Sequence, residues 1–554
     1  MSKKAKNKAA LSWIGGRIKK FIPEITLISL ISGVTSVSFV ALALVSRDVI
    51  DIATGSKSGG LAKSGLLLFA IIIGQIILSA VSSVIKARVS GRMTISMRNS
   101  LFSGIVKKKY PNISSRHSGD ILNRLTSDTE VIVSGAVSII PAVVSTFAKI
   151  IAGIGALFFL NRTFALIILV LGITVPAIGR AINRKFKYLH KECQRSEGVT
   201  RSFLQECFEN VIVIKSFISE KPFLKKLNRS MDENYRYKMK RNGVSVFANM
   251  SLYSFFTVGY YTVLLWSAGL ISNGSISYGT LTAFLQLISQ LRAPLQNISG
   301  ILPQYYSAIA SAERLMELVA GEDEHTPLTG EGLDSLKNEF KTINATGVNF
   351  AYDGEEVLSD CTLTLERGKI TAITGESGCG KSTLFKLLLG LYEPQSGSIT
   401  INGNIPVGAA TRGLFAYVPQ GNLILSGTIR ENLTLCDDGI SDAAVEEAAK
   451  AAEIYDYIVS LPDGFETVIS ERGTGLSEGQ LQRIAIARAL LYDAPVLLLD
   501  ESTSALDEQT ETRLLSNIKA LPDKTVIFIT HRNTSISVCD RIIHVENKRF
   551  CKIK

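Results

Sequence analysis

The chain has 554 residues, of which 46% are hydrophobic, and its formal net charge is +11 at pH 7. At roughly 150 residues per domain, this length excludes a single compact domain and indicates about three or four units. The positive charge could suggest nucleic-acid binding, but the Lys and Arg residues gather in segments that alternate with apolar runs, as in membrane proteins that follow the positive-inside rule. We therefore expect a lipid bilayer, and no nucleic acid, as a partner.

Apolar runs of membrane-spanning length are confined to the first 300 residues. A helix needs about 20 apolar residues to cross a bilayer. The runs that meet this length with at most one charged residue are 25–46, 64–85, 141–160 and 163–182, and the uncharged run 242–291 is divided by SNGS at 272–275 into a hairpin. We expect six spans in an all-α transmembrane domain over residues 1–320.

The basic residues distinguish the two sides of these spans. Seven precede the first span and nine lie between Lys86 and Arg124, whereas the connections 161–162 and 272–275 contain only Arg162. This asymmetry predicts a multi-pass membrane protein with both termini in the cytosol. The long inward connections 86–135 and 183–241 are charged and amphipathic, which indicates helices that continue out of the membrane.

The remainder of the chain has the amino-acid composition of a soluble domain. Residues 321–339, which begin GEDEHTPLTGEG, are rich in Gly, Pro and acids and are expected to be a linker. From residue 340 to 554, short β-branched runs such as KITAITG, VLLLD and TVIFIT alternate with helical stretches. This alternation predicts an α/β domain with a largely parallel sheet.

The segment GESGCGKS at 375–382 fits the phosphate-loop pattern GxxxxGK[ST] and connects a strand-like run, KITAIT, to a helix-like run. The glycines let the backbone wrap round phosphates, and the helix N-terminus presents free N–H groups to them. Lys381 would reach the β- and γ-phosphates of ATP, and Ser382 would bind Mg²⁺. The expected nucleotide contacts of this loop are Gly375, Glu376, Ser377, Gly378, Cys379, Gly380, Lys381, Ser382 and Thr383.

A second motif, VLLLDE at 496–501, supplies two carboxylates. An apolar strand that ends in two acids places Asp500 near the metal ion and Glu501 where it can polarise the attacking water. The same pattern can be a simple strand end, but its position after a phosphate loop favours hydrolysis. ATP and Mg²⁺ are therefore the predicted cofactors.

The order of motifs in the soluble part resembles the nucleotide-binding domain of ABC transporters, an α/β phosphate-loop domain with a helical subdomain. The motifs are Tyr352, GESGCGKST, VPQ with Gln420, ERG at 471–473, LSEGQ at 476–480, VLLLDE, SALD at 504–507 and His531. With six spans before it, the chain resembles a bacterial half-transporter of the ABC exporter family, which includes multidrug pumps, lipid flippases and peptide exporters. YPNISSRHSGDILNRLTSD from residue 110 and SAERLMEL from residue 311 also resemble that family.

The resemblance implies a role for each motif. Tyr352 would stack on adenine, and Gln420 would contact Mg²⁺ and the attacking water. Asp507 would couple two ATP sites across a dimer, and His531 would contact the γ-phosphate. The ERG segment at 471–473 would contact the inward loops of the membrane domain.

LSEGQ at 476–480 is implied to bind the γ-phosphate of ATP held by the partner subunit, through Ser477, Gly479 and Gln480. The Ser477 hydroxyl, the Gly479 N–H and the positive end of the following helix suit a phosphate. Ser477 with Gln480 also fits an ordinary helix capping box, and both roles can hold at once. The commonest signature has glycine where this chain has Glu478, which adds a negative charge near the phosphate.

We therefore expect an ATP hydrolase that drives export of an amphipathic drug, lipid or peptide by alternating access. All hydrolytic motifs are present, which favours a homodimer, while a heterodimer with a degenerate partner stays open. An ATP-gated channel or regulator is a second hypothesis, which intact Glu501 and His531 disfavour, and an importer with an exporter-like fold is a third.

One charge within the spans bears on the cargo. Lys149 lies about 12 Å into the third span, at 1.5 Å per residue, where a charge normally faces a bundle interior or water. With no acid in the six core spans and with aromatic residues in span five, the cavity would prefer neutral or anionic amphiphiles. Alternatively, Lys149 bonds a backbone carbonyl and the aromatic residues simply pack. The aromatic residues concerned are Tyr253, Phe256, Tyr260 and Tyr261.

Overall fold

The computed structural model describes residues 3–552 except 117, 377, 422–423 and 471–474. It divides into two compact units, the first formed by residues 1–103 and 118–320 and the second by 104–117 and 321–554. The second unit thus includes a short stretch of the first inward connection, which the sequence had assigned to the membrane domain. The reason is local, because helix α4 (Tyr110–Ser114) in this stretch packs against the α/β fold through contacts described below.

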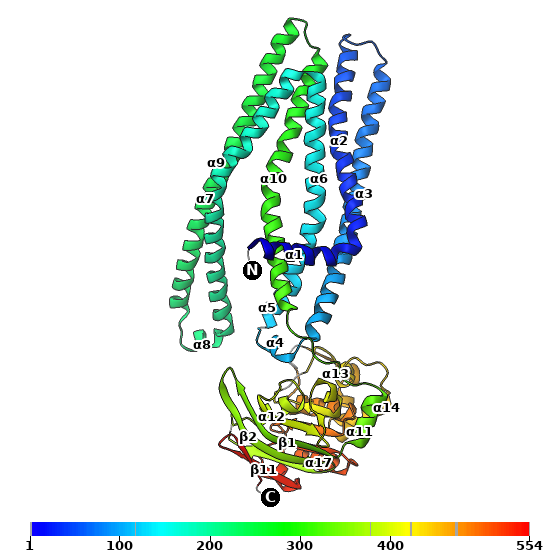
Figure 1. The fold of residues 1–554 in the computed structure, drawn as a ribbon, viewed down its shortest axis with the longest axis vertical. Helices are drawn as coiled ribbons and strands as arrows, with labels where there is room; N and C mark the ends of the chain where they lie inside the picture. Colours follow the sequence, from blue (N-terminus) through cyan, green and yellow to red (C-terminus); the bar gives the residue numbers. More distant parts are fainter. Residues whose placement is uncertain (1–2, 117, 377, 422–423, 471–474, 553–554) are drawn as a thin grey trace. The chain divides into compact units, whose positions relative to one another are not determined.

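The first unit is helical, and its long helices are drawn in Figure 1. Each of the six predicted spans lies on one of them. The helices are α1 (Lys3–Ile18), α2 (Ile22–Ala53), α3 (Leu61–Val106), α5 (Ser118–Asn123), α6 (Thr129–Leu160), α7 (Arg162–Glu209), α8 (Val211–Ser216), α9 (Glu220–Ser272) and α10 (Tyr278–Leu318), with short turns of 3₁₀ helix at Lys19–Phe21 and of π helix at Arg124–Asp128.

Length and composition mark some of these helices as able to cross a membrane. Within the described residues four helical stretches qualify, Ala5–Ala53, Leu61–Val106, Ser118–Leu160 and Glu220–Ser272. The predicted span 163–182 falls on α7, where the side chains lie outside the described residues. The predicted sixth span falls on α10, where Gln286 and Gln290 interrupt the apolar run.

The apolar packing of the first unit centres on α2, α6, α9 and α10. Their shared cluster includes Val40, Ala156, Leu157, Phe284 and Leu287, all of them buried. In contrast, α3 leaves most of its apolar side chains exposed, among them Leu66 at 76% and Phe69 at 66%. Such a face suits lipid or another membrane helix rather than water.

Two motifs that resemble the exporter family meet in the first unit. Asp128, at the end of the first motif, is 4% exposed. Its carboxylate accepts hydrogen bonds from Ser311 Oγ at 2.9 Å and from Arg314 Nε at 2.8 Å, both in SAERLMEL. This ion pair joins a buried carboxylate to a half-exposed guanidinium. It fixes the start of α6 against the inner part of α10, since the buried Asp128 charge would be costly without a partner.

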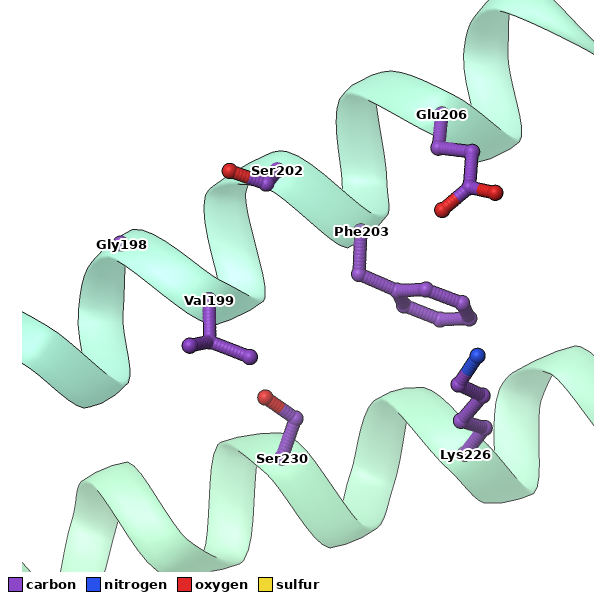
Figure 2. Close-up of a pocket in the computed structure, with 7 residues that line it drawn as sticks. All are labelled: Gly198, Val199, Ser202, Phe203, Glu206, Lys226 and Ser230. Atoms are coloured by element: carbon purple, nitrogen blue, oxygen red, sulfur yellow. The ribbon is translucent and has the colours of Figure 1, made fainter.

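Helices α7 and α9 run side by side and are joined by polar and cation–π contacts. Thr200 Oγ1 and Ser230 Oγ lie 2.7 Å apart, and the Lys226 ammonium lies 4.6 Å from the centre of the Phe203 ring. An open pocket of about 510 Å³ lies between them, and Figure 2 shows the side chains that line it. Its lining is Gly198, Val199, Ser202, Phe203 and Glu206 of α7 with Lys226 and Ser230 of α9.

The second unit contains two principal sheets. Among the described residues the first has four antiparallel strands in the order β2-β1-β4-β5, and the second has six strands in the order β12-β11-β3-β10-β9-β6, all parallel except β12. Their bounds are β1 Thr342–Tyr352, β2 Glu355–Glu366, β3 Ile370–Gly375, β4 Ser396–Ile401, β5 Ile405–Pro406, β6 Phe415–Val418, β9 Val496–Asp500, β10 Thr525–Ile529, β11 Arg541–Glu546 and β12 Arg549–Lys552. A small pair, β7 Gly427–Thr428 and β8 Val468–Ile469, lies apart.

Strands β9 and β10 are buried along their whole length, as expected of parallel strands covered on both faces. The helices are α12 (Lys381–Leu388), α13 (Ile429–Thr434), α14 (Asp442–Ala451), α15 (Tyr455–Ser460), α16 (Glu478–Leu491), α17 (Glu508–Ala520) and α18 (Asn533–Val538). Helices α13 to α15 are inserted between β6 and β9 and form a helical subdomain whose apolar side chains pack with those of α16.

The segment 321–339, expected to be a linker, contains one regular element. Helix α11 (Glu331–Glu339) closes it, and Leu336 on this helix is 6% exposed within the core of the α/β domain. The Gly, Pro and acidic residues before this helix predicted an irregular segment. The sequence EGLDSLKNE forms a helix because its apolar side chains are buried against the α/β domain.

Candidate active site

The phosphate loop connects β3 to α12 and depends on glycine at two points. Gly375 has φ +145, and a Cβ there would lie 2.6 Å from the carbonyl oxygen of Val545. Gly380 has φ +100, and a Cβ there would lie 2.8 Å from Leu358 Cδ2. Any other residue would be strained and crowded at both positions. The loop is therefore closed tightly over the end of β3, as a backbone that wraps a phosphate must be. Ser377 of this loop lies outside the described residues.

Lys381 holds a positive charge in the loop. Lys381 is only 5% exposed. Nζ donates hydrogen bonds to the carbonyl oxygens of Gly375 and Glu376, each at 2.7 Å. Both of these partners are neutral, and among the described residues no carboxylate forms an ion pair with the buried ammonium. A phosphate bound in the loop would supply the counter-charge.

Ser382 and Asp500 form the oxygen-rich side of the site. Ser382 Oγ donates to Asp500 Oδ1 at 3.0 Å, and Tyr417 Oη donates to Asp500 Oδ2 at 3.3 Å. Burial raises the pKa of Asp500, and the neighbouring Glu501 raises it further, while the two hydroxyl donors lower it. A cation beside this carboxylate would relieve the cost of burying its charge.

These donors fit Mg²⁺. The ion prefers oxygen ligands and usually binds through one or two protein groups together with substrate phosphates. Hydroxyl and carboxylate oxygens are what Ser382 and Asp500 offer. In the described part of the chain no group of three or more His, Cys, Asp or Glu side chains is placed to hold a metal ion.

Glu501 lies where the two other predicted catalytic side chains converge. Gln420 Nε2 donates a hydrogen bond of 2.8 Å to Glu501 Oε2, and His531 Nε2 lies 3.5 Å from Glu501 Oε1. The backbone of Glu501 has φ +47, a strained value for a residue with a side chain, and its N–H donates to Ile529 O at 3.1 Å. The strand end therefore holds this carboxylate in one fixed place between Gln420 and His531.

Tyr352, expected to stack on adenine, belongs to an aromatic cluster. Its ring meets Phe350 edge-on at 4.8 Å between centroids and Tyr392 at 5.3 Å. Lys386 of α12 lies 5.8 Å from the ring centre. The ring is partly exposed, so it is rigidly supported and still accessible to a base. Its role toward adenine stays a prediction.

The aromatic cluster continues to α4. Tyr110 meets Tyr392 edge-on at 5.6 Å, and Ser114 Oγ lies 3.3 Å from Tyr392 Oη. Lys109 forms ion pairs with Glu322 at 3.0 Å and Glu393 at 3.2 Å. The hydrogen bonds from Lys109 to Glu322 and Glu393 raise the pKa of Lys109. The sequence did not identify Tyr392 as a functional residue, because only the fold brings it between β1 and the motif that begins at residue 110.

LSEGQ forms the start of α16. The Ser477 N–H donates to Gln480 Oε1 at 2.7 Å and the Gln480 N–H donates to Ser477 Oγ at 3.3 Å, so the predicted capping box is present. A Cβ on Gly479 would lie 2.9 Å from the Ala505 carbonyl oxygen, which explains the glycine. The signature thus packs against the SALD segment. ERG at 471–473 lies outside the described residues.

Asp507 caps α17. Its carboxylate accepts from the Thr510 N–H at 2.9 Å, and the hydrogen bonds from Thr510 hold the pKa of Asp507 below its ordinary value. This exposed acid ends the SALD segment beside the signature. Of the five histidines, His531 reaches Glu501, whereas His544 Nδ1 lies 3.0 Å from Thr374 Oγ1 and has a structural place between β11 and β3.

Comparison with known proteins shows which family the chain resembles over its length. A family model described as ABC transporter transmembrane region matches residues 22–295, and one described as ABC transporter matches residues 358–504. A probable ABC transporter ATP-binding/permease protein of Haemophilus influenzae is 32% identical over 470 residues, 82% of this chain and 83% of that protein. An ATP-dependent lipid A-core flippase of Desulfotalea psychrophila is 30% identical over 495 residues, 88% of this chain and 85% of that protein.

A solved structure shares the fold over nearly the whole chain. The structure of a bacterial Atm1-family ABC exporter with ATP bound matches with a TM-score of 0.79 at 24% identity, covering 96% of this chain and 94% of that chain. The predicted fold class, a helical transmembrane domain followed by an α/β nucleotide-binding domain, is confirmed.

Proposed function

Because the chain belongs to the ABC transporter family and its α/β domain hydrolyses ATP to drive transport, we propose that it exports an amphipathic substrate as a dimer. The relatives to which it is similar include ATP-dependent lipid A-core flippases. We place it in the cytoplasmic membrane with both termini in the cytosol, following the distribution of its basic residues.

The observation that carries this proposal is the convergence of Gln420 and His531 on Glu501, beside Lys381 and the Ser382–Asp500 pair. A channel regulated by nucleotide binding needs only the phosphate cradle. A site that also holds a carboxylate between an amide and an imidazole is built to activate water. A site equipped to hydrolyse ATP favours an active transporter over an ATP-gated channel.

The residues divide the chemistry between them. Lys381 and the loop N–H groups hold the phosphates and stabilise charge that develops on them. Glu501 accepts the proton of the attacking water, which Gln420 helps to orient, and His531 contacts the γ-phosphate. Bound Mg²⁺, held by Ser382 and Asp500 near Gln420, would neutralise charge on the phosphate oxygens.

Two features support a dimer. Ser477 caps α16 and Gly479 lies in its first turn. Because the first N–H groups of a helix have no partner within the helix, they suit a phosphate, which in our proposal belongs to a nucleotide on another subunit. The turn around α8 also exposes large apolar side chains, with Ile212 77%, Phe217 76% and Ile218 84% exposed. An apolar tip of this kind fits a protein partner. Because each hydrolytic motif is intact, a second copy of the chain is the partner we propose.

Transport into inside-out vesicles tests the proposal. Vesicles that contain the wild-type protein should accumulate a fluorescent amphiphile when ATP is added outside, and vesicles with the Glu501→Gln variant should not. Release of preloaded amphiphile on adding ATP would instead identify an importer. Ion flux that follows ATP binding in the Glu501→Gln variant would identify a gated channel.

A further inference from the structure

Arg532, which follows His531 directly in the chain, holds the backbone of the SALD segment. Its Nη1 donates to the Leu506 carbonyl oxygen at 2.7 Å, and its Nη2 donates to the Ser504 carbonyl oxygen at 2.5 Å. A guanidinium can hold two carbonyls at once because its N–H groups form a planar fork. The position of the SALD segment is therefore tied to the residue beside His531.

A buried carboxylate fixes this guanidinium. Glu511 on α17 is 0% exposed, and it accepts hydrogen bonds from Arg532 Nη1 at 3.0 Å and Thr503 Oγ1 at 2.9 Å, and also from Ser535 Oγ. A fully buried carboxylate is tolerated only with such partners. Glu511 thus joins α17, the residues after β9 and α18 at one point.

The opposite side of the SALD segment is held by the signature helix. Gln482 of α16 is 5% exposed, and its Nε2 donates to Ser504 Oγ at 3.1 Å while its Oε1 accepts from the Ala505 N–H at 3.1 Å. Gly479 lies against the Ala505 carbonyl. The SALD segment is therefore held by Arg532 on one side and by LSEGQ and helix α16 on the other.

From this arrangement we infer that Arg532 and Glu511 are positioning residues that connect His531 to the groups offered to the partner's nucleotide. The inference rests on the proposed function, in which LSEGQ completes the ATP site of a second copy. When the His531 backbone shifts toward a γ-phosphate, Arg532 carries the Ser504 and Leu506 carbonyls with it, and the signature helix follows. Occupancy of one site then sets the geometry of the other.

Hybrid dimers separate this role from a local one. The two subunits carry different affinity tags, and the first subunit carries Glu501→Gln, so hydrolysis takes place at the site of the second subunit. Adding Arg532→Lys to the first subunit changes only the signature and SALD segment that it offers. Adding Arg532→Lys to the second subunit changes the surroundings of its own His531. Lysine keeps the charge beside Glu511 but cannot hold both carbonyls.

We expect Arg532→Lys in the first subunit to slow hydrolysis about five-fold or more, within the usual range of coupling between sites, and at least as much as the same change in the second subunit. Arg541→Lys is the matched control, because Arg541 also bonds a carboxylate, of Glu366, and a carbonyl, of Thr364, but belongs to β11. An effect confined to the second subunit would overturn the inference.

Two further variants make the outcome decisive. If the Arg532→Lys protein unfolds, the double variant Glu511→Gln with Arg532→Gln removes both charges of the pair, so that no buried carboxylate is left without a partner, and should give the same loss in the first subunit. Ser477→Ala with Gly479→Ala in the first subunit tests the shared site itself. If that change leaves hydrolysis intact, the proposed function fails. If it abolishes hydrolysis while the Arg532 variants have no effect there, only the role of Arg532 is wrong.

Discussion

Gln420 and Glu501 are 81 residues apart in the chain and are joined by a hydrogen bond of 2.8 Å from Nε2 to Oε2. The bond fixes one carboxylate oxygen of Glu501, while the other faces His531. An amide in place of this carboxylate would still accept the bond through its oxygen. The geometry of the site can therefore be kept while its basicity is removed.

Glu501→Gln should bind ATP normally and hydrolyse it slowly. Loss of a general base typically costs 10²–10⁴-fold in rate, while Lys381 and the phosphate loop are untouched. Phosphate release measures the rate, and binding of a fluorescent ATP analogue provides the control. Hydrolysis near the wild-type rate would show that Glu501 is not the base.

Hybrids of two defective subunits should recover one complete site. In the proposed dimer, a subunit with Ser477→Ala and Gly479→Ala still has its own phosphate loop, and a subunit with Lys381→Ala still has its signature. Each homodimer lacks working sites, but the doubly tagged hybrid pairs an intact loop with an intact signature. One of the two sites is complete, so we expect at most about half of the wild-type activity per dimer, and less than half where the empty Lys381→Ala site weakens the signature that its subunit offers. Activity equal to the mean of the two parents would contradict the shared site.

Cys379 offers a chemical probe of the phosphate loop. Its sulfur lies 4.0 Å from Lys381 Nζ and is partly exposed. A maleimide attached there would occupy the space where phosphates bind, so it should inhibit hydrolysis, and bound ATP should protect. The Cys379→Ser protein is the control, since inhibition that persists in it would arise at another cysteine.

Local motifs could be located from the sequence because their spacing is local. GESGCGKS had to join a strand to a helix, and it lies between β3 and α12. The capping box at Ser477 also needs only residues three apart. The contacts of Tyr417 with Asp500 and of Arg532 with Glu511 join distant segments. No periodicity marks such pairs, so they emerge only from the folded sheet.

The packing of α4 against the α/β domain also could not be predicted from the sequence. YPNISSRHSGD could be compared with a family, but nothing in it predicts that Tyr110 meets Tyr392, which is far along the chain. The helix α11 within the expected linker was missed for a similar reason, since its apolar face consists of only two leucines, Leu333 and Leu336, in a nine-residue helix that follows a Gly- and Pro-rich stretch. Both elements are stabilised by the domain they pack on.

Tyr110→Leu should uncouple hydrolysis from transport. The substitution removes the edge-to-face contact with Tyr392, and such contacts contribute about 0.5–1.5 kcal/mol. Because Tyr110 belongs to a loop between two membrane helices, weaker docking should lower the amount of cargo moved per ATP several-fold while basal hydrolysis continues. Tyr110→Phe keeps the ring and is the matched control. Equal transport per ATP in the leucine variant would remove α4 from the coupling path.

Lys149 gives the most specific prediction about cargo. Its ammonium lies 4.5 Å from the centre of the Phe39 ring, so this charge of α6 rests on an aromatic face of α2. The contact differs from the backbone hydrogen bond considered as an alternative. Cation–π pairs contribute about 0.5–2 kcal/mol, which only partly offsets the cost of a charge in the membrane. An anionic group on a passing substrate would stabilise the ammonium further.

Aromatic surface for such a substrate exists on α9, where Tyr253 is 50% and Tyr261 is 58% exposed. Lys149→Met should therefore abolish stimulation of ATP hydrolysis by anionic amphiphiles and spare stimulation by neutral ones. Lys149→Arg keeps the charge and should keep the preference. Basal hydrolysis should be unchanged in both, because Lys149 lies in a span and not in the ATP site. If the methionine variant responds to the same amphiphiles as the wild type, Lys149 serves only to pack against Phe39 and does not select the cargo.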